Sequence, residues 1–204
     1  MEEFRLLFDK RIADLEKNNR WKTAADIVLE QWETNPNDLN CVLCAGTQLW
    51  YTILVMDYIR DDPSPPTAIE FIPDIQLKKH LMNVTRYGFK HFANNPIFNA
   101  YYGYMICLMP YFFLDYNGDY LGWQEKGHKM MRRSYNLDPN SPFTKAMYYE
   151  LEGYGKGTLF YDACKEIWSI TTPEQWGNSE VQQYFFRILH GDSFYIDAFP
   201  QVSN

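Results

Sequence analysis

The amino-acid sequence predicts an all-α protein whose helices pair into antiparallel hairpins. Corners at Pro36, Pro96 and Pro139 divide the chain into segments. Proline ends the helix before it but is tolerated in the first turn of the helix that follows. The segments around these corners repeat their apolar residues at helical spacing. No run combines the period-two alternation and β-branched residues of a strand with a two-residue hairpin turn. We therefore expect helices packed on helices.

Nine helices are expected in chain order. Before Pro36, the apolar residues recur every three or four positions, as one buried helix face requires. These residues are Trp21, Ala24, Ala25, Val28 and Trp32. The segment before Pro139 repeats the pattern with Met130, Met131, Tyr135 and Leu137. The expected ranges are 2–18, 21–34, 39–59, 74–94, 97–116, 120–136, 142–152, 158–170 and 180–190.

Capping chemistry marks several helix ends. Ser141 precedes a proline at a first helical position, while Thr172 and Ser179 each have a Gln three residues later, as in a capping box. Glycines at 153, 155 and 157 predict a helix stop, since leaving a helix often needs left-handed backbone. The proline-rich run 61–66 is expected to be a loop on the rim.

Length and charge limit the function classes. We expect residues 1–204 to form a single domain. The chain has 26 Asp and Glu against 19 Lys and Arg, a net charge of −7, so its field would repel a phosphate backbone. Nucleic acid is therefore not expected as a partner, whereas a basic protein or peptide is. Aromatic residues make up 18% of the chain and suit binding surfaces as well as cores.

The sequence also predicts a cytoplasmic protein with reduced thiols. The N-terminus has no basic start, apolar middle and small-residue cleavage site of a secretory signal. The four cysteines (Cys41, Cys44, Cys107 and Cys164) each lie among apolar residues, which suits buried thiols. The uncharged stretches 39–56 and 97–114 contain polar residues and lack a clear Lys/Arg asymmetry on their flanks. We expect buried helices there and no membrane span.

The segment from Trp21 to Leu49 resembles the tetratricopeptide repeat (TPR). Residues on both sides of the Pro36 corner match the small and large packing positions of that repeat. They are Ala24, Val28, Val42, Ala45, Gly46 and Leu49. The three corners lie 60 and 43 residues apart, farther than the repeat length of about 34. The resemblance implies an irregular TPR-like superhelix of stacked hairpins, with another α-helical stack as the alternative.

No motif carries chemistry. The run 115–119 starts like a calcium loop, but Tyr120 stands where glycine is needed and Lys126 where a Glu should close the shell. An Asx-type turn is the better interpretation. The glycines from 153 to 157 resemble a phosphate loop, but the spacing around Lys156 is wrong and a helix precedes them. We expect a helix connection there.

The remaining reactive residues do not form a site either. Cys41 and Cys44 have the spacing of half a zinc site but lack a second pair at a suitable distance. The histidines (His80, His91, His128 and His190) are scattered along the chain. The run His190-Gly191-Asp192-Ser193 cannot form a triad, because chain neighbours cannot reach one another in that geometry. We predict no catalytic residue, no metal and no cofactor.

The predicted function is binding of another protein on the concave surface of the stack. Aromatic side chains would line that surface and acidic side chains its rim. The aromatic candidates are Trp50, Tyr51, Tyr101, Tyr102, Tyr148 and Tyr149, and the acidic candidates are Asp61, Asp62 and Glu152.

Within protein binding, we favour an acidic inhibitor that neutralises a basic toxin or nuclease by occlusion, in the manner of bacterial immunity proteins. Carboxylates would steer the encounter and aromatic side chains would slow release. No immunity-family motif supports this. A TPR-like scaffold or chaperone subunit is the first alternative. An enzyme with a dispersed site and a regulator that binds a small ligand or peptide between its helices are the others.

Overall fold

The computed structural model describes residues 4–61, 70, 73–114, 119–151 and 157–190. Within these ranges every regular element is a helix, and no strand occurs. This confirms the all-α prediction. The α-helices are α1 (Arg11–Lys17), α2 (Trp21–Thr34), α3 (Leu39–Asp61), α4 (Asp74–His91), α5 (Pro96–Leu108), α6 (Tyr120–Leu137), α7 (Pro142–Leu151), α8 (Gly157–Ile170), α9 (Pro173–Trp176) and α10 (Glu180–Leu189), and a 3₁₀ helix, η1, spans Pro110–Phe113.

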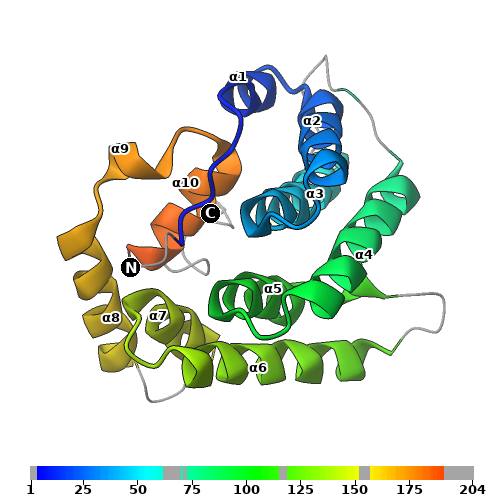
Figure 1. Ribbon diagram of the computed structural model, residues 1–204. Helices are drawn as coiled ribbons and strands as arrows, with labels where there is room; N and C mark the ends of the chain where they lie inside the picture. The colour runs from blue at the N-terminus through cyan, green and yellow to red at the C-terminus, as the bar shows by residue number, and fades with distance from the viewer. Residues whose placement is uncertain (1–3, 62–69, 71–72, 115–118, 152–156, 191–204) are drawn as a thin grey trace, which may run out of the picture.

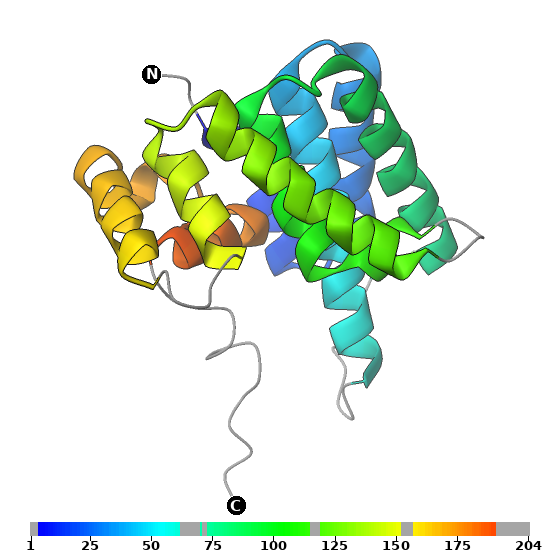
Figure 2. The ribbon, with the colours of Figure 1, turned by 90° about the horizontal axis from the view of Figure 1, so that it is seen from below.

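Helices that follow one another pack together and form an arc. The packed pairs include α2 with α3, α3 with α4, α5 with α6 and α7 with α8. Figure 1 shows the arc running from α1 to α8, with α9 and α10 closing it. The last helix, α10, lies against both α3 and α7. Figure 2 shows the C-terminal end of α3 extending beyond the other helices, where Tyr58 is 59% exposed.

The predicted corners and caps are present. The Asn95 side chain accepts a hydrogen bond from the Phe98 N–H at 2.9 Å, and Pro96 is the first residue of α5. At the start of α10, the Ser179 hydroxyl accepts from the Gln182 backbone N–H, and the Gln182 side-chain oxygen Oε1 accepts from the Ser179 backbone N–H, each at 3.1 Å. Thr172 is the N-cap of the short helix α9, and its backbone N–H donates to the Gln175 side chain at 2.8 Å. This helix was not among the expected ranges.

Two of the expected ranges need correction. The first helix begins at Arg11 rather than at residue 2: residues 4–9 are non-helical, with a bend at Arg5, and bury Phe4 and Leu6 while Leu7 is exposed. The helix expected over 97–116 ends at Leu108, since Pro110 has no N–H and disfavours helical backbone before it. Of the expected stop glycines, Gly157 is the first residue of α8, and those at 153 and 155 lie outside the described residues.

Helices α3 and α5 form the centre of the core. Every side chain of α5 from Ile97 to Cys107 is buried, which explains why this segment carries no charge. The stretch Leu39–Tyr58 of α3 is long and apolar enough to cross a membrane, but 72% of it is buried inside the protein. A core helix passes the same test of length and composition.

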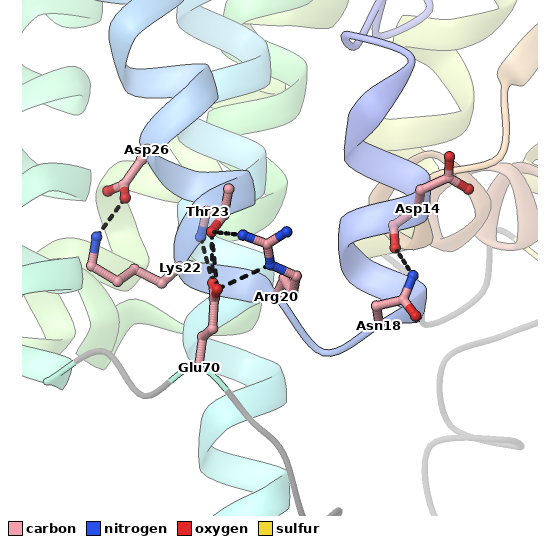
Figure 3. Close-up of polar contacts among 7 residues, drawn as sticks. All are labelled: Asp14, Asn18, Arg20, Lys22, Thr23, Asp26 and Glu70. Carbon is pink, nitrogen blue, oxygen red and sulfur yellow. Dashed lines mark hydrogen bonds and ion pairs between the residues drawn. The ribbon is translucent and has the colours of Figure 1, made fainter.

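The N-terminus of α2 is capped by a residue distant in sequence. Arg20 precedes the helix and provides no side-chain cap. Instead, the Glu70 carboxylate accepts from the Thr23 N–H at 2.9 Å, from the Thr23 hydroxyl at 2.8 Å and from Arg20 Nε at 3.1 Å (Figure 3). These contacts, led by the Thr23 N–H, lower the pKa of Glu70. The long connection between α3 and α4 is therefore fixed to α2 at this point.

Candidate functional site

The expected concave binding surface is filled by the chain itself. Trp50, Tyr101 and Tyr102 are each 0% exposed, so they belong to the core and present no surface to a partner. The structure thus places three of the predicted partner-binding residues in the core of the folded chain. The rings of Trp50 and Tyr184 are 5.6 Å apart, and those of Tyr101 and Phe185 are 4.8 Å apart. Helix α10 thus occupies the place that a partner would need.

Tyr51 lies at the edge of the same interface. It is half-buried, and its ring centroid is 5.5 Å from that of Tyr184. Burial raises the pKa of Tyr51 to about 12, with the carboxylate of Glu180 adding to the rise. The hydroxyl is therefore a neutral hydrogen-bonding group at physiological pH.

Tyr148 and Tyr149 lie partly exposed beside a third tyrosine that sequence reasoning missed. Tyr135 of α6 stacks on Tyr148 of α7 with ring centroids 5.0 Å apart and an interplanar angle of 12°. The Tyr149 ring is 5.9 Å from Tyr135 and 5.3 Å from Tyr148. A hydrogen bond with Tyr135 is the main cause that raises the pKa of Tyr149, and burial is the second. We call these three residues the tyrosine cluster.

The neighbouring helix α8 carries large apolar side chains on its exposed sides. Its buried residues follow one helical stripe: Phe160, Ala163, Cys164 and Ile167. The exposed residues are Leu159 (47%), Tyr161 (49%), Trp168 (38%) and Ile170 (42%). The helical spacing of the buried stripe could have revealed this exposed set from the sequence. An ion pair of 3.4 Å between Lys145 and Glu166 joins α7 to α8.

The charges are divided along the chain rather than spread evenly. Residues 1–72 contain 13 Asp or Glu and 7 Lys or Arg, residues 73–137 contain 4 and 8, and residues 138–204 contain 9 and 4. The tyrosine pair of α7 and all of α8 belong to the acidic C-terminal part. Among the predicted acidic candidates, Asp61 is the last residue of α3, and Asp62 and Glu152 lie outside the described residues.

The basic residues of the middle part lie mainly on α4 and α6. Lys129, Arg132 and Arg133 line a shallow hollow on α6 together with Asn136 and Leu137. Lys126 lies over the rings of Phe89 and Trp123, at 3.8 and 4.6 Å from their centroids. Partial burial there lowers the pKa of Lys126. This outer face of α6 favours an anionic group, in contrast to the net charge of the chain.

A buried carboxyl group joins α1, α3 and α10. Glu16 is 2% exposed, and its oxygens accept from the Gln48 side-chain amide at 3.0 Å and from the Glu180 N–H at 2.6 Å. Burial raises the pKa of Glu16 to about 7, although both hydrogen bonds oppose the rise. The side-chain oxygen Oε1 of Gln48 has no hydrogen-bond partner within the described ranges. If the Gln48 side-chain amide rotated by half a turn, a protonated Glu16 could donate a hydrogen bond to this oxygen.

Glu16 should make the stability of the protein fall as pH rises. Its pKa in the folded chain, about 7, exceeds its usual value of 4.5, so the folded state holds a proton that the unfolded state has released. The stabilisation is complete below about pH 4.5 and is lost as pH rises through about 7. In the wild type, we expect the free energy of unfolding to fall by roughly 1–3 kcal/mol between pH 5 and 8 because of Glu16. The variant Glu16→Gln should not show this fall.

Urea denaturation at a series of pH values measures this effect. The exposed Glu33 of α2 provides the control, because Glu33→Gln should leave the slope of unfolding free energy against pH as it is in the wild type. Equal slopes for the wild type and Glu16→Gln would show that Glu16 is not the group responsible.

The other potentially reactive residues that the structure describes have packing or capping roles. In the part of the chain that the structure describes, no group of three or more His, Cys, Asp or Glu residues could hold a metal ion. Cys44 is buried, and burial raises the pKa of its thiol. Asp119 caps α6 by accepting from the Gly122 N–H at 2.9 Å. His190 follows α10 and stacks on Trp168 at 5.4 Å. The segments 115–118, 153–156 and 191–193 lie outside the described residues.

Comparison with protein-family models, with curated proteins and with solved structures found no match to this chain.

Proposed function

We propose that the chain is a non-enzymatic protein-binding module with a TPR-like stack of helical hairpins, acting in the cytoplasm. Its binding surface consists of the tyrosine cluster together with the exposed apolar residues of α8. The observation that carries this proposal is the partly exposed stack of Tyr135 on Tyr148. The Lys145–Glu166 ion pair joins α7, which carries Tyr148, to α8. Tyrosine at such a place offers a large apolar area and a hydroxyl handle.

Exposed apolar residues on an outer helix support the same proposal. The outer helices of a repeat stack usually need a polar outer face for solubility. Here α8 packs mainly on α7 and exposes Leu159, Tyr161, Trp168 and Ile170. Leu159 and Ile170 flank one side of the buried stripe of α8, and Tyr161 and Trp168 flank the other, so each flank presents a pair of exposed apolar side chains. The α2–α3 hairpin supports the TPR-like arrangement, since Ala24, Ala45 and Leu49 are all 0% exposed.

The partner that we propose is a basic protein, and the role is that of an acidic immunity protein which neutralises a toxin by occlusion. The acidic excess of residues 138–204 supports a basic partner, because this part of the chain contains α7 and α8. Acidic side chains would raise the association rate, and the buried aromatic contacts would lower the dissociation rate. A scaffold that holds two partners is the alternative, favoured by the basic outer face of α6.

Replacing both Tyr148 and Tyr149 by Ala should weaken partner binding at least tenfold, because buried tyrosines are frequent hot spots worth about 2 kcal/mol or more. The partner is first captured from the native host on the full-length chain and identified by mass spectrometry. Its affinity for the wild type and the variant is then measured by calorimetry. A basic protein is expected, with an association rate that falls as salt is added.

Tyr120→Ala provides the matched control, since Tyr120 is 43% exposed at the start of α6, outside the tyrosine cluster. This variant should bind like the wild type. Recovery of a metabolite in place of a protein would contradict the proposed function. Equal affinities of the wild type and the Tyr148/Tyr149 double variant would contradict the proposed surface.

A further inference from the structure

The N-terminal segment Phe4–Asp9, which we call the arm, is non-helical with a bend at Arg5, and its trace leads past α10 into α1 (Figure 1). Its side chains alternate as in a β-strand: Phe4 and Leu6 are 7% and 1% exposed, whereas Leu7 is 53% exposed. The arm forms neither a helix nor a strand. Its position must therefore be held by contacts with other elements.

Three side chains from three helices hold the arm by its main chain. Tyr101 of α5 donates its hydroxyl to the Phe4 carbonyl oxygen at 2.8 Å, and the Gln182 amide of α10 donates to the Leu6 carbonyl oxygen at 2.7 Å. Asn40 of α3 accepts from the Leu7 N–H at 2.9 Å and donates to the Leu7 carbonyl oxygen at 3.0 Å. Main-chain contacts of this kind suit any extended peptide.

The hydrogen bonds from Tyr101 and Gln182 to the arm are buried in the folded chain. Tyr101 is 0% exposed and Gln182 is 7% exposed, so both polar groups are out of reach of bulk water. Buried polar groups are almost always hydrogen-bonded, since an unpaired one is destabilising. Without the arm, the hydroxyl of Tyr101 and the amide of Gln182 would lose these partners.

Side-chain contacts add sequence preference. The Phe4 ring stacks on Phe143 of α7, with centroids 4.8 Å apart and an interplanar angle of 13°, and lies 5.7 Å from the Trp176 ring. Leu6, two residues later, enters the core beside it. Alternate side chains in pockets, with main-chain hydrogen bonds between them, are how extended peptides are recognised.

We propose that the groove between α3, α5, α7 and α10 is a binding site for a short non-helical peptide, and that the arm occupies it in cis. Its ligand has an aromatic residue followed two positions later by an aliphatic one. A partner protein that offers such a segment would replace the arm. Tethering gives the arm a high effective concentration, so a free peptide competes poorly for the wild-type groove. This site is separate from the tyrosine cluster.

A fluorescein-labelled peptide of residues 2–10 tests the site on full-length chains by fluorescence polarisation. The double variant Phe4→Ala, Leu6→Ala weakens the arm, so it should bind the peptide at least tenfold more tightly than the wild type does. The peptide carrying the same two alanines should bind neither chain. Leu7→Ala in the full-length chain is the matched control and should behave like the wild type, because that side chain points outward.

Absence of peptide binding to the folded double variant would overturn the inference. Should that variant fail to fold, a protease site inserted between Asp9 and Lys10 of the full-length chain provides the second measurement. After cleavage, the fragment should elute with the helices in gel filtration and exchange for the labelled peptide. Separation of the fragment, unfolding on cleavage or lack of exchange within a day would each count against a peptide site. None of these measurements involves Tyr148 or Tyr149, so they are independent of the proposed outer surface.

Discussion

Replacing Phe185 of α10 by Ala should lower the free energy of unfolding by about 3–5 kcal/mol, the range for a fully buried Phe. Phe185 is 0% exposed, and its ring lies 4.8 Å from Tyr101 and 5.8 Å from Tyr104. Removal of the ring would leave a cavity where α10 meets α5, at the centre of the arc. The effect follows from α10 being a core helix rather than an appendage.

Urea denaturation followed by far-UV circular dichroism measures this loss. Arg187→Ala, two residues further along α10, is the control, because Arg187 is exposed and exposed substitutions usually change stability by less than about 0.5 kcal/mol. If Phe185→Ala were as stable as Arg187→Ala, α10 would not be packed into the arc, and the aromatic surface of α3 and α5 would be open to a partner after all.

Replacing Gly127 of α6 by Ala should lower the free energy of unfolding by about 3 kcal/mol, at the upper end of the usual cost of overpacking. A Cβ atom there would lie 2.7 Å from the Cys107 Sγ, 2.8 Å from the Cys107 backbone nitrogen and 3.0 Å from the Gly103 carbonyl oxygen. Two of these three atoms are backbone, so rotation of one side chain cannot relieve the clash. The helices α5 and α6 would have to separate.

Gly157→Ala is the matched control for this prediction. Gly157 is the exposed first residue of α8, and no heavy atom lies within 4 Å of the place its Cβ would take. Because Ala favours helical backbone over Gly, the variant should be unchanged or more stable by up to about 1 kcal/mol. Midpoints of urea denaturation compare the two variants with the wild type. Equal midpoints for Gly127→Ala and Gly157→Ala would disprove the close approach of α5 and α6.

The filled concave surface changes where a partner can bind. In a stack whose inner face is open, Tyr101 and Tyr102 would be available for contact. Here α10 and the arm cover that face, so the two places that we propose for protein contact are the outer surface of α7 and α8 and the groove that the arm occupies. The two places make different demands on a partner, a folded surface in the first case and an extended segment in the second.

Local patterns in the sequence predicted most of the helices. The caps at Asn95 and Ser179 and the corner at Pro36 involve residues within about four positions, and such short-range chemistry is written in adjacent residues. The helix expected over 2–18 is present as α1 but begins at Arg11, because the arm before it is too short to show a clear period. Phe4 and Leu6 are buried and Leu7 is exposed only because of the helices that pack against the arm, which the local sequence does not reveal.

The tertiary structure alone decided which aromatic residues are covered. The pairs Tyr101–Tyr102 and Tyr148–Tyr149 look alike in the sequence, yet the first pair is buried and the second is partly exposed. The difference comes from contacts between distant residues, such as the hydrogen bond between Tyr101 and Phe4, which are 97 positions apart. Helix propensity depends on near neighbours, whereas burial depends on which helix folds back against which, and no single segment carries that information.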